Sequence, residues 1–223
     1  MRFAATAGGE ARRGATLALP LAVAVALFGV SFGVLSQSPR GMGALAAVAM
    51  SATTFAGSAQ FAAASILEAG GGVIAAMVAA VLLNLRYLPI GVSVAPAIRG
   101  GVLRRLVAAQ LAVDESWAIS ANGDGTYSVG RLAGAGLVLW LAWVGGTIIG
   151  VNGGEALGDP SVLGLDAAFP ALFLALLWAQ LRSRRASVAA LLGAGIALAL
   201  VPFAPPGVPI IAAAAAALVG WRR

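Results

Sequence analysis

Long apolar stretches dominate the chain, and short polar or charged clusters separate them. The stretches run for roughly 15 to 27 residues, against the roughly 20 that an α-helix needs to cross a bilayer. Turn residues such as Gly70-Gly71-Gly72 and Pro205-Pro206-Gly207 lie between them. The pattern predicts an all-α, polytopic transmembrane helix bundle that forms a single domain over residues 1–223. Its expected helical segments are Thr16–Leu35, Gly41–Leu67, Gly72–Ile98, Leu106–Ala121, Leu132–Val151, Leu165–Leu181, Ala186–Val201 and Val208–Trp221.

Composition supports a membrane protein and excludes several other classes. The chain is 61% hydrophobic and 10% charged, which is more apolar surface than one soluble core can bury. The net charge of +6 does not indicate nucleic-acid binding, because no basic stripe is interleaved with aromatic residues. Cys and His are both absent, which removes thiol catalysis, the usual zinc or haem ligands and a His general base. We therefore expect no enzyme activity and no cofactor.

The arginine clusters constrain how the segments cross the membrane. If all eight crossed, Arg12 and Arg13 would lie opposite the loop from Arg99 to Arg105, against the positive-inside rule. Our hypothesis is that Gly41–Leu67 and Leu106–Ala121 are broken or re-entrant, which leaves about six full spans; seven or eight spans are the alternatives. The N- and C-termini then lie in the cytoplasm of a bacterial cell, at the inner membrane.

The first 13 residues form a short cytoplasmic basic lead in this interpretation. The apolar run that follows is longer than the core of a secretory signal peptide, so we expect it to remain as an anchor. Helix packing in lipid relies on small residues that let backbones approach closely. Glycine pairs four residues apart fit this role; they are Gly29 with Gly33, Gly130 with Gly134, and Gly146 with Gly150.

Polar residues inside the apolar segments are the functional candidates, because an unsatisfied polar group at bilayer depth costs several kcal/mol. The first group is Gly57, Ser58 and Gln60, preceded by Ser51 and Thr54. Glycine beside serine and threonine lets a membrane helix unwind and present backbone groups to a small ligand. The alternative is helix packing through small residues, with Gln60 hydrogen-bonded to a neighbouring segment.

The second group is Asn84 and Arg86, followed by Pro89. Arg86 is too far from either end of its segment to reach the membrane surface easily, so we expect it to face a cavity or to pair with an acid. Pro89 removes one backbone hydrogen bond near Leu85 and favours a kink or break there. This is either binding-site material or a structural ion pair.

The third group is Asp114, Glu115 and Trp117. In a continuous helix Asp114 shares a face with Gln110 and Trp117, while Glu115 points elsewhere, so the two acids have different partners. One acid is expected to pair with Arg86, and the other to bind an ammonium group or carry a coupling proton. The alternative places both acids among lipid headgroups. A fourth candidate, Asp166, is better explained as a helix N-terminal residue ahead of Pro170.

Four stretches, in order and at matching spacing, resemble the AzlC family, the larger component of two-component bacterial branched-chain amino acid exporters. The resemblance covers the chain from about residue 14 to 220. At Tyr87 the chain departs from the His that we expect in many members, so a His-dependent proton step does not carry over. The matching stretches are Phe55-Ala56-Gly57-Ser58-Ala59-Gln60-Phe61, Asn84-Leu85-Arg86, Asp114-Glu115, and Gly164-Leu165-Asp166-Ala167-Ala168-Phe169-Pro170-Ala171-Leu172-Phe173.

The resemblance implies export of neutral, mainly branched-chain amino acids, together with a small AzlD-type membrane subunit. Our working site places the substrate carboxylate near Gly57 and Ser58, aided by Arg86, and its ammonium at Asp114 or Glu115. Phe55, Phe61 and Trp117 are assigned to the aliphatic side chain. An uncoupled channel or pore subunit is the nearest alternative; a membrane hydrolase or a scaffold for a partner is weaker. Assembly into a homo-oligomer is left open.

Overall fold

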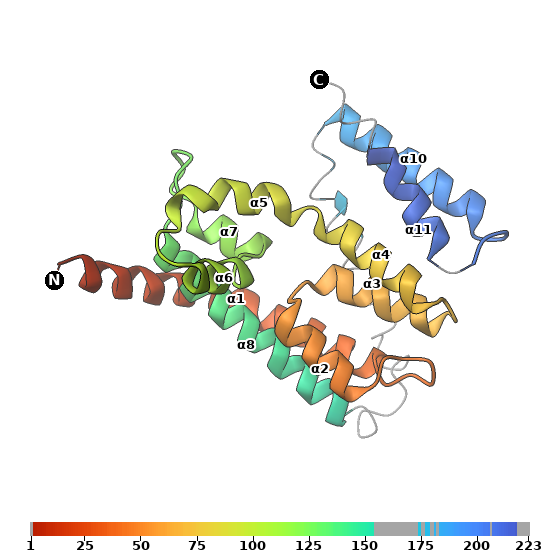
Figure 1. The fold of residues 1–223 in the computed structure, drawn as a ribbon, viewed down its shortest axis with the longest axis horizontal. Helices are drawn as coiled ribbons and strands as arrows, with labels where there is room; N and C mark the ends of the chain where they lie inside the picture. Colours follow the sequence, from red (N-terminus) through yellow and green to blue (C-terminus); the bar gives the residue numbers. More distant parts are fainter. Residues whose placement is uncertain are drawn as a thin grey trace.

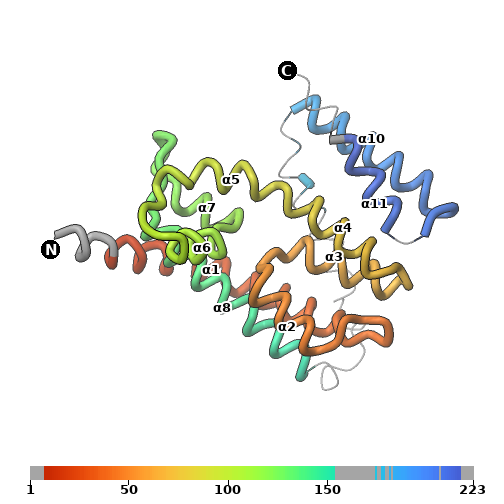
Figure 2. Tube along the Cα trace, in the orientation of Figure 1, coloured from red at the N-terminus to blue at the C-terminus, as the bar shows by residue number. Residues whose placement is uncertain are grey.

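The computed structural model describes residues 2–153, 174, 177–178, 181, 183–205 and 207–217, and its named elements there are all helical. Figure 1 shows two long helices side by side, with shorter helices packed along them, and Figure 2 traces the same path as a tube. The all-α prediction is confirmed. The helices are α1 (Arg2–Leu35), α2 (Ala44–Thr53), α3 (Gly57–Glu68), α4 (Val73–Asn84), α5 (Tyr87–Val94), η1 (Ala95–Ala97), α6 (Val102–Gln110), α7 (Asp114–Ser120), α8 (Val129–Gly153), α10 (Arg184–Leu200), α11 (Val208–Ala213) and η2 (Ala214–Ala217).

The two long helices, α1 and α8, run parallel and touch along their length. Gly29 faces the backbone of Trp143, and Gly33 faces that of Thr147. Gly150 in turn lies against the carbonyl of Val30, so a Cβ at any of these glycines would collide with backbone. The predicted pairs at Gly29/Gly33 and Gly146/Gly150 therefore do pack helices, and they do so against each other.

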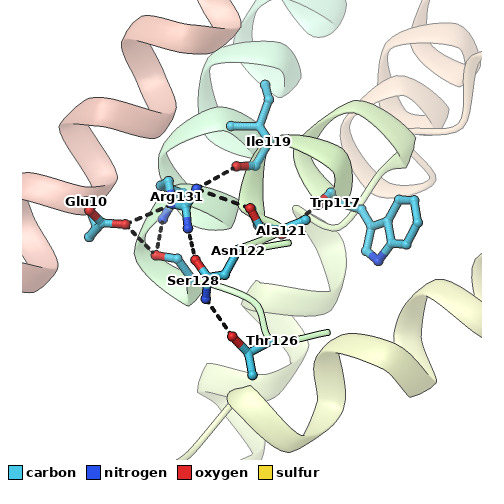
Figure 3. A network of polar contacts seen from close by, with 9 residues as sticks. Glu10, Trp117, Ile119, Ala121, Asn122, Thr126, Ser128 and Arg131 are labelled. Atoms are coloured by element: carbon cyan, nitrogen blue, oxygen red, sulfur yellow. Dashed lines mark hydrogen bonds and ion pairs between the residues drawn. The ribbon is translucent and has the colours of Figure 1, made fainter. Parts of the chain in front are cut away.

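A polar network, shown in Figure 3, joins the N-terminal part of α1 to the start of α8. The Nε of Arg131 on α8 donates to the Glu10 carboxylate on α1 over 2.8 Å. Its Nη1 donates to the carbonyls of Ile119 and Ala121, where α7 ends, at 3.3 Å each. Helix α1 thus continues back through the basic lead, and Arg131 fixes the end of α7 to the scaffold.

Three of the shorter segments are interrupted. Helices α2 and α3 are separated at residues 54–56, α4 and α5 at Leu85 and Arg86, and α6 and α7 at residues 111–113. The expected breaks within Gly41–Leu67 and Leu106–Ala121 are confirmed. The third lies within Gly72–Ile98, counted above as a full span with a kink near Pro89.

The third break lies one turn before Pro89, where the sequence predicted a kink or break. Pro89 cannot donate to Leu85, and the Leu85 carbonyl accepts instead from the Leu88 N–H over 3.1 Å. The two halves of this segment, Val73–Asn84 and Tyr87–Ala97, are bent by 42°.

Two described helices are long and apolar enough to cross a membrane, over Gly8–Leu35 and Val129–Gly153, and the bent segment makes a third if it counts as one span. The described residues therefore account for two or three of the six full spans that the sequence predicts, and the total of six stays a prediction. Helix α10 coincides with the expected segment Ala186–Val201. Most of Leu165–Leu181, including Asp166, lies outside the described residues.

Candidate functional site

A cavity of about 260 Å³ lies where the broken segments meet the α1–α8 scaffold. We call it the polar cavity. The five residues predicted to bind the charged groups of the substrate all line it, from three different broken segments: Gly57, Ser58, Arg86, Asp114 and Glu115. The structure thus brings together residues that are up to 58 positions apart in sequence, counted from 57 to 115. The rest of the lining is Leu21, Ala24, Val25, Phe28, Phe55, Tyr87, Val113, Leu139 and Trp143.

Arg86 is held on one side of this cavity by an acid and an aromatic ring. Its Nη2 lies 3.2 Å from the Oδ2 of Asp114, and the expected ion pair is therefore present. The same nitrogen donates to the Tyr87 hydroxyl over 3.2 Å, and the guanidinium carbon lies 5.0 Å from the centre of the Tyr87 ring. The Arg86 and Asp114 side chains stay 34% and 41% exposed, so the pair is accessible from the cavity.

Glu115 forms no ion pair with any described residue, although it lines the same cavity. Asp114 and Glu115 both lie in the first turn of α7, where the partial positive charge of a helix N-terminus favours carboxylates. The expected face shared by Asp114 and Gln110 is wrong, because one helix ends at Gln110 and the next begins at Asp114. Gln110 donates instead to the carbonyl of Ala52 over 3.2 Å.

The N-terminus of α3 opens onto the cavity opposite these charges. No side chain caps this helix, and Ser58 Oγ is buried without a hydrogen-bond partner among the described residues. A Cβ at Gly57 would lie 3.1 Å from the Trp143 ring, so glycine is the residue that fits under this tryptophan. Gly57 and Ser58 are the first residues of α3 and line the cavity, so the start of this helix, where the first N–H groups lack intrahelical acceptors, borders the cavity.

Gln60 lies behind the break and is completely buried. Its Oε1 accepts from Trp143 Nε1 over 3.0 Å and from the Ala56 N–H over 3.2 Å. Its Nε2 donates to Ser51 Oγ over 2.9 Å, and Ser51 in turn bonds Thr147 over 2.9 Å. Gln60 thus ties the broken segment to α8, as the packing alternative expected, and it does not line the polar cavity.

Two further predicted residues also lie outside the polar cavity. Asn84 ends α4, and its Oδ1 is buried without a partner among the described residues. Trp117 donates from Nε1 to Ser93 Oγ over 2.9 Å and packs on the Tyr127 ring, which links α7 to α5. Phe61, assigned above to the aliphatic pocket, packs in the core against Phe32 and Trp143.

Of the three aromatic residues predicted to contact the aliphatic side chain, Phe55 lines the cavity, but the rest of its apolar wall was missed by sequence reasoning. Leu21, Val25 and Phe28 of α1 and Leu139 and Trp143 of α8 supply it. They belong to unbroken helices whose apolar residues carry no signal that separates a cavity wall from ordinary packing. Tyr87 was noticed only as a departure from a family pattern, yet it contacts Arg86 directly.

Comparison with known proteins assigns the family. The model of the AzlC family, described as AzlC protein, matches residues 20–157. An uncharacterized membrane protein of Archaeoglobus fulgidus is 33% identical over 94% of this chain and 94% of its own length. The inner membrane protein YgaZ of Escherichia coli is 28% identical over 83% of this chain and 81% of its own. The branched-chain amino acid transport protein AzlC of Bacillus subtilis is 28% identical over 81% of this chain and 72% of its own length.

No solved structure matches the chain. A polar cavity enclosed by apolar helices, at the junction of three broken segments, is the architecture of a membrane transport protein. The chain belongs to the AzlC family.

Proposed function

We propose that this protein exports neutral, mainly branched-chain amino acids across a bacterial inner membrane. The polar cavity is the substrate site, and the observation that carries the proposal is its combination of charges and walls. It presents an accessible Arg86–Asp114 pair, an additional carboxylate at Glu115, an uncapped helix N-terminus at Gly57, and an aliphatic and aromatic wall.

A zwitterionic amino acid with an apolar side chain needs three environments: a site for its carboxylate, a site for its ammonium group and an apolar surface for its side chain. Its carboxylate is matched by the amides of the α3 N-terminus and by Arg86, as half-helix termini bind anions in transporters. Its ammonium group is matched by Glu115, which has no ion-pair partner among the described residues, and by Asp114. The aliphatic side chain is matched by Leu21, Val25 and Leu139. A relative in Bacillus subtilis whose name is branched-chain amino acid transport protein supports the same substrate class.

We further propose that export is coupled to protons and that the chain works with a small AzlD-type membrane subunit. Glu115 is the group we assign to the coupling proton, because it lines the cavity and forms no ion pair with the described residues. Carboxyl groups at membrane depth are common members of the proton relays of pumps and transporters.

The test is amino-acid accumulation in an exporter-deletion strain that is fed leucine- and valine-containing dipeptides. The chain, expressed with a small AzlD-type membrane subunit, should lower intracellular leucine and valine. Asp114→Asn and Glu115→Gln should each prevent this at normal expression. If both variants export normally, the assignment of the acids is wrong. Efflux that is saturable and stops when the proton gradient is dissipated supports coupled transport, whereas gradient-independent, non-saturating flux identifies an uncoupled channel.

A further inference from the structure

A second cavity, about 370 Å³ in volume, adjoins the polar cavity. The two share three lining residues, Phe55, Tyr87 and Val113. Beyond these, the second cavity continues past Val94 to Ile98 and Arg105. It therefore extends from the boundary of the polar cavity toward the arginine-rich stretch from Arg99 to Arg105, which the positive-inside rule predicts to be cytoplasmic.

The three shared residues have one structural feature in common. Phe55 lies in the break between α2 and α3, Tyr87 begins α5 directly after the second break, and Val113 precedes α7 at the third. Each broken segment thus contributes its break residue to the boundary between the two cavities. Three helix breaks with unrelated roles would not be expected to meet at the same boundary between two cavities.

Phe55 has the most unusual backbone of the three. Its φ is 44°, and among the described residues other than glycine it alone has a positive φ. Side chains with a Cβ rarely adopt this conformation, and such strained residues gather at ligand clamps and switch regions. The residue is 6% exposed and lines both cavities.

We propose that the second cavity is the cytoplasmic entrance to the substrate site, and that Phe55, Tyr87 and Val113 form the constriction through which a substrate passes. The entrance is mainly apolar, with Arg105 near its mouth to attract a carboxylate. The identity of the substrate rests on the proposed function, while the existence of the constriction does not.

The absence of cysteine in the native chain permits a direct test by labelling single cysteines. Thr54 lines the entrance and Ser58 lines the polar cavity, on either side of Phe55, and both substitutions to cysteine change the side-chain volume little. A membrane-impermeant thiol reagent is applied to inverted membrane vesicles that carry Thr54→Cys or Ser58→Cys in the full-length protein. Thr54→Cys should react fast and Ser58→Cys slowly.

Adding Phe55→Gly to Ser58→Cys should raise the labelling rate at position 58 by about tenfold, because this substitution removes the ring that lies between the two cavities. Glycine also tolerates the positive φ, so this variant relieves backbone strain rather than adding it. Phe55→Leu is the matched control that retains bulk, and it should keep labelling at position 58 slow. Labelling at Thr54→Cys should be the same in both backgrounds.

The inference is overturned if Ser58→Cys reacts as fast as Thr54→Cys in the otherwise native chain, or if Phe55→Gly leaves its rate unchanged. Labelling requires no transported substrate, so its result is independent of the export assay. A constriction seen by labelling in a protein that exports no amino acid would reject the proposed function and retain the entrance.

Discussion

The α1–α8 pair and the broken segments that pack on it use their small and polar residues in opposite ways. In the pair, glycines bring two continuous backbones together and leave no space between them. In the broken segments, the helix stops at residues 54–56, and Gly57 and Ser58 at the start of α3 line a cavity. The comparison indicates that the same residue types build a rigid scaffold where helices continue and a binding site where they stop.

The scaffold should be the part least tolerant of added volume. Gly150→Leu places side-chain atoms against the Val30 carbonyl and should prevent the two helices from packing, with loss of most folded protein. Gly145→Leu is the matched control on the same helix, because nothing lies within 4 Å of its Cβ position. Fluorescence-detected size-exclusion chromatography measures the difference. Equal yields of folded protein from the two variants would show that the close contact at Gly150 is not needed for α1 and α8 to pack.

In the broken region the largest effect is expected on transport rather than on folding. Arg86→Gln removes the cation of the polar cavity and leaves Asp114 without its ion-pair partner. Leucine export should fall at least about tenfold, because the substrate carboxylate loses the positive charge that it is proposed to meet there. Arg104→Gln, outside both cavities, is the control and should export at the native rate. Export is measured in the dipeptide-fed strain at matched protein levels, and normal export by Arg86→Gln would contradict the account.

Gln60 tests the joint between the two regions. Gln60→Leu leaves the Trp143 N–H, the Ala56 N–H and Ser51 without this partner, and each unsatisfied buried group costs about 1–3 kcal/mol. A clear drop in the melting temperature of the purified protein is expected. Ser58→Ala removes a hydroxyl that has no hydrogen-bond partner among the described residues, and it should leave the melting temperature nearly unchanged. A Gln60→Leu protein as stable as the native one would show that the network does not hold the break in place.

The smallest effect is expected at Trp117. Trp117→Phe removes the hydrogen bond to Ser93 and keeps an aromatic ring against Tyr127, so the loss in stability should be about 1 kcal/mol. Thermal unfolding measures this loss, and leucine uptake into inverted vesicles should keep its native rate. A large loss of transport with unchanged stability would instead place Trp117 in the substrate path, as the sequence alone suggested.

The sequence was informative where a local physical cause acts within a few residues. Pro89 predicts the break near Leu85, and the Gly29/Gly33 spacing predicts a close helix contact. An arginine amid apolar residues predicts an ion pair, and Arg86 has one. Each of these conclusions required only the identity of nearby residues in the sequence and the assumption that the surrounding solvent is lipid.

What escaped prediction depends on contacts between distant segments. Nothing near Leu21 or Leu139 distinguishes a cavity wall from a packed core, because both roles use the same residues. Gln110 was placed on the face of Asp114 by assuming a continuous helix, and the break at residues 111–113 separates them. Gln60 was equally compatible with substrate binding and packing until its partners on α8 were known.

The central claim is that the polar cavity binds a neutral amino acid, and substrate protection of a cysteine on its apolar wall tests it most directly. Val25→Cys replaces a lining residue of α1 with a side chain of similar size. The labelling rate of this cysteine is measured in vesicles with and without leucine, valine, lysine or glutamate. Leucine and valine should slow labelling in a saturable manner, and lysine and glutamate should not. If none of the four changes the rate, or all four do so equally, the cavity is not the site of a neutral amino acid.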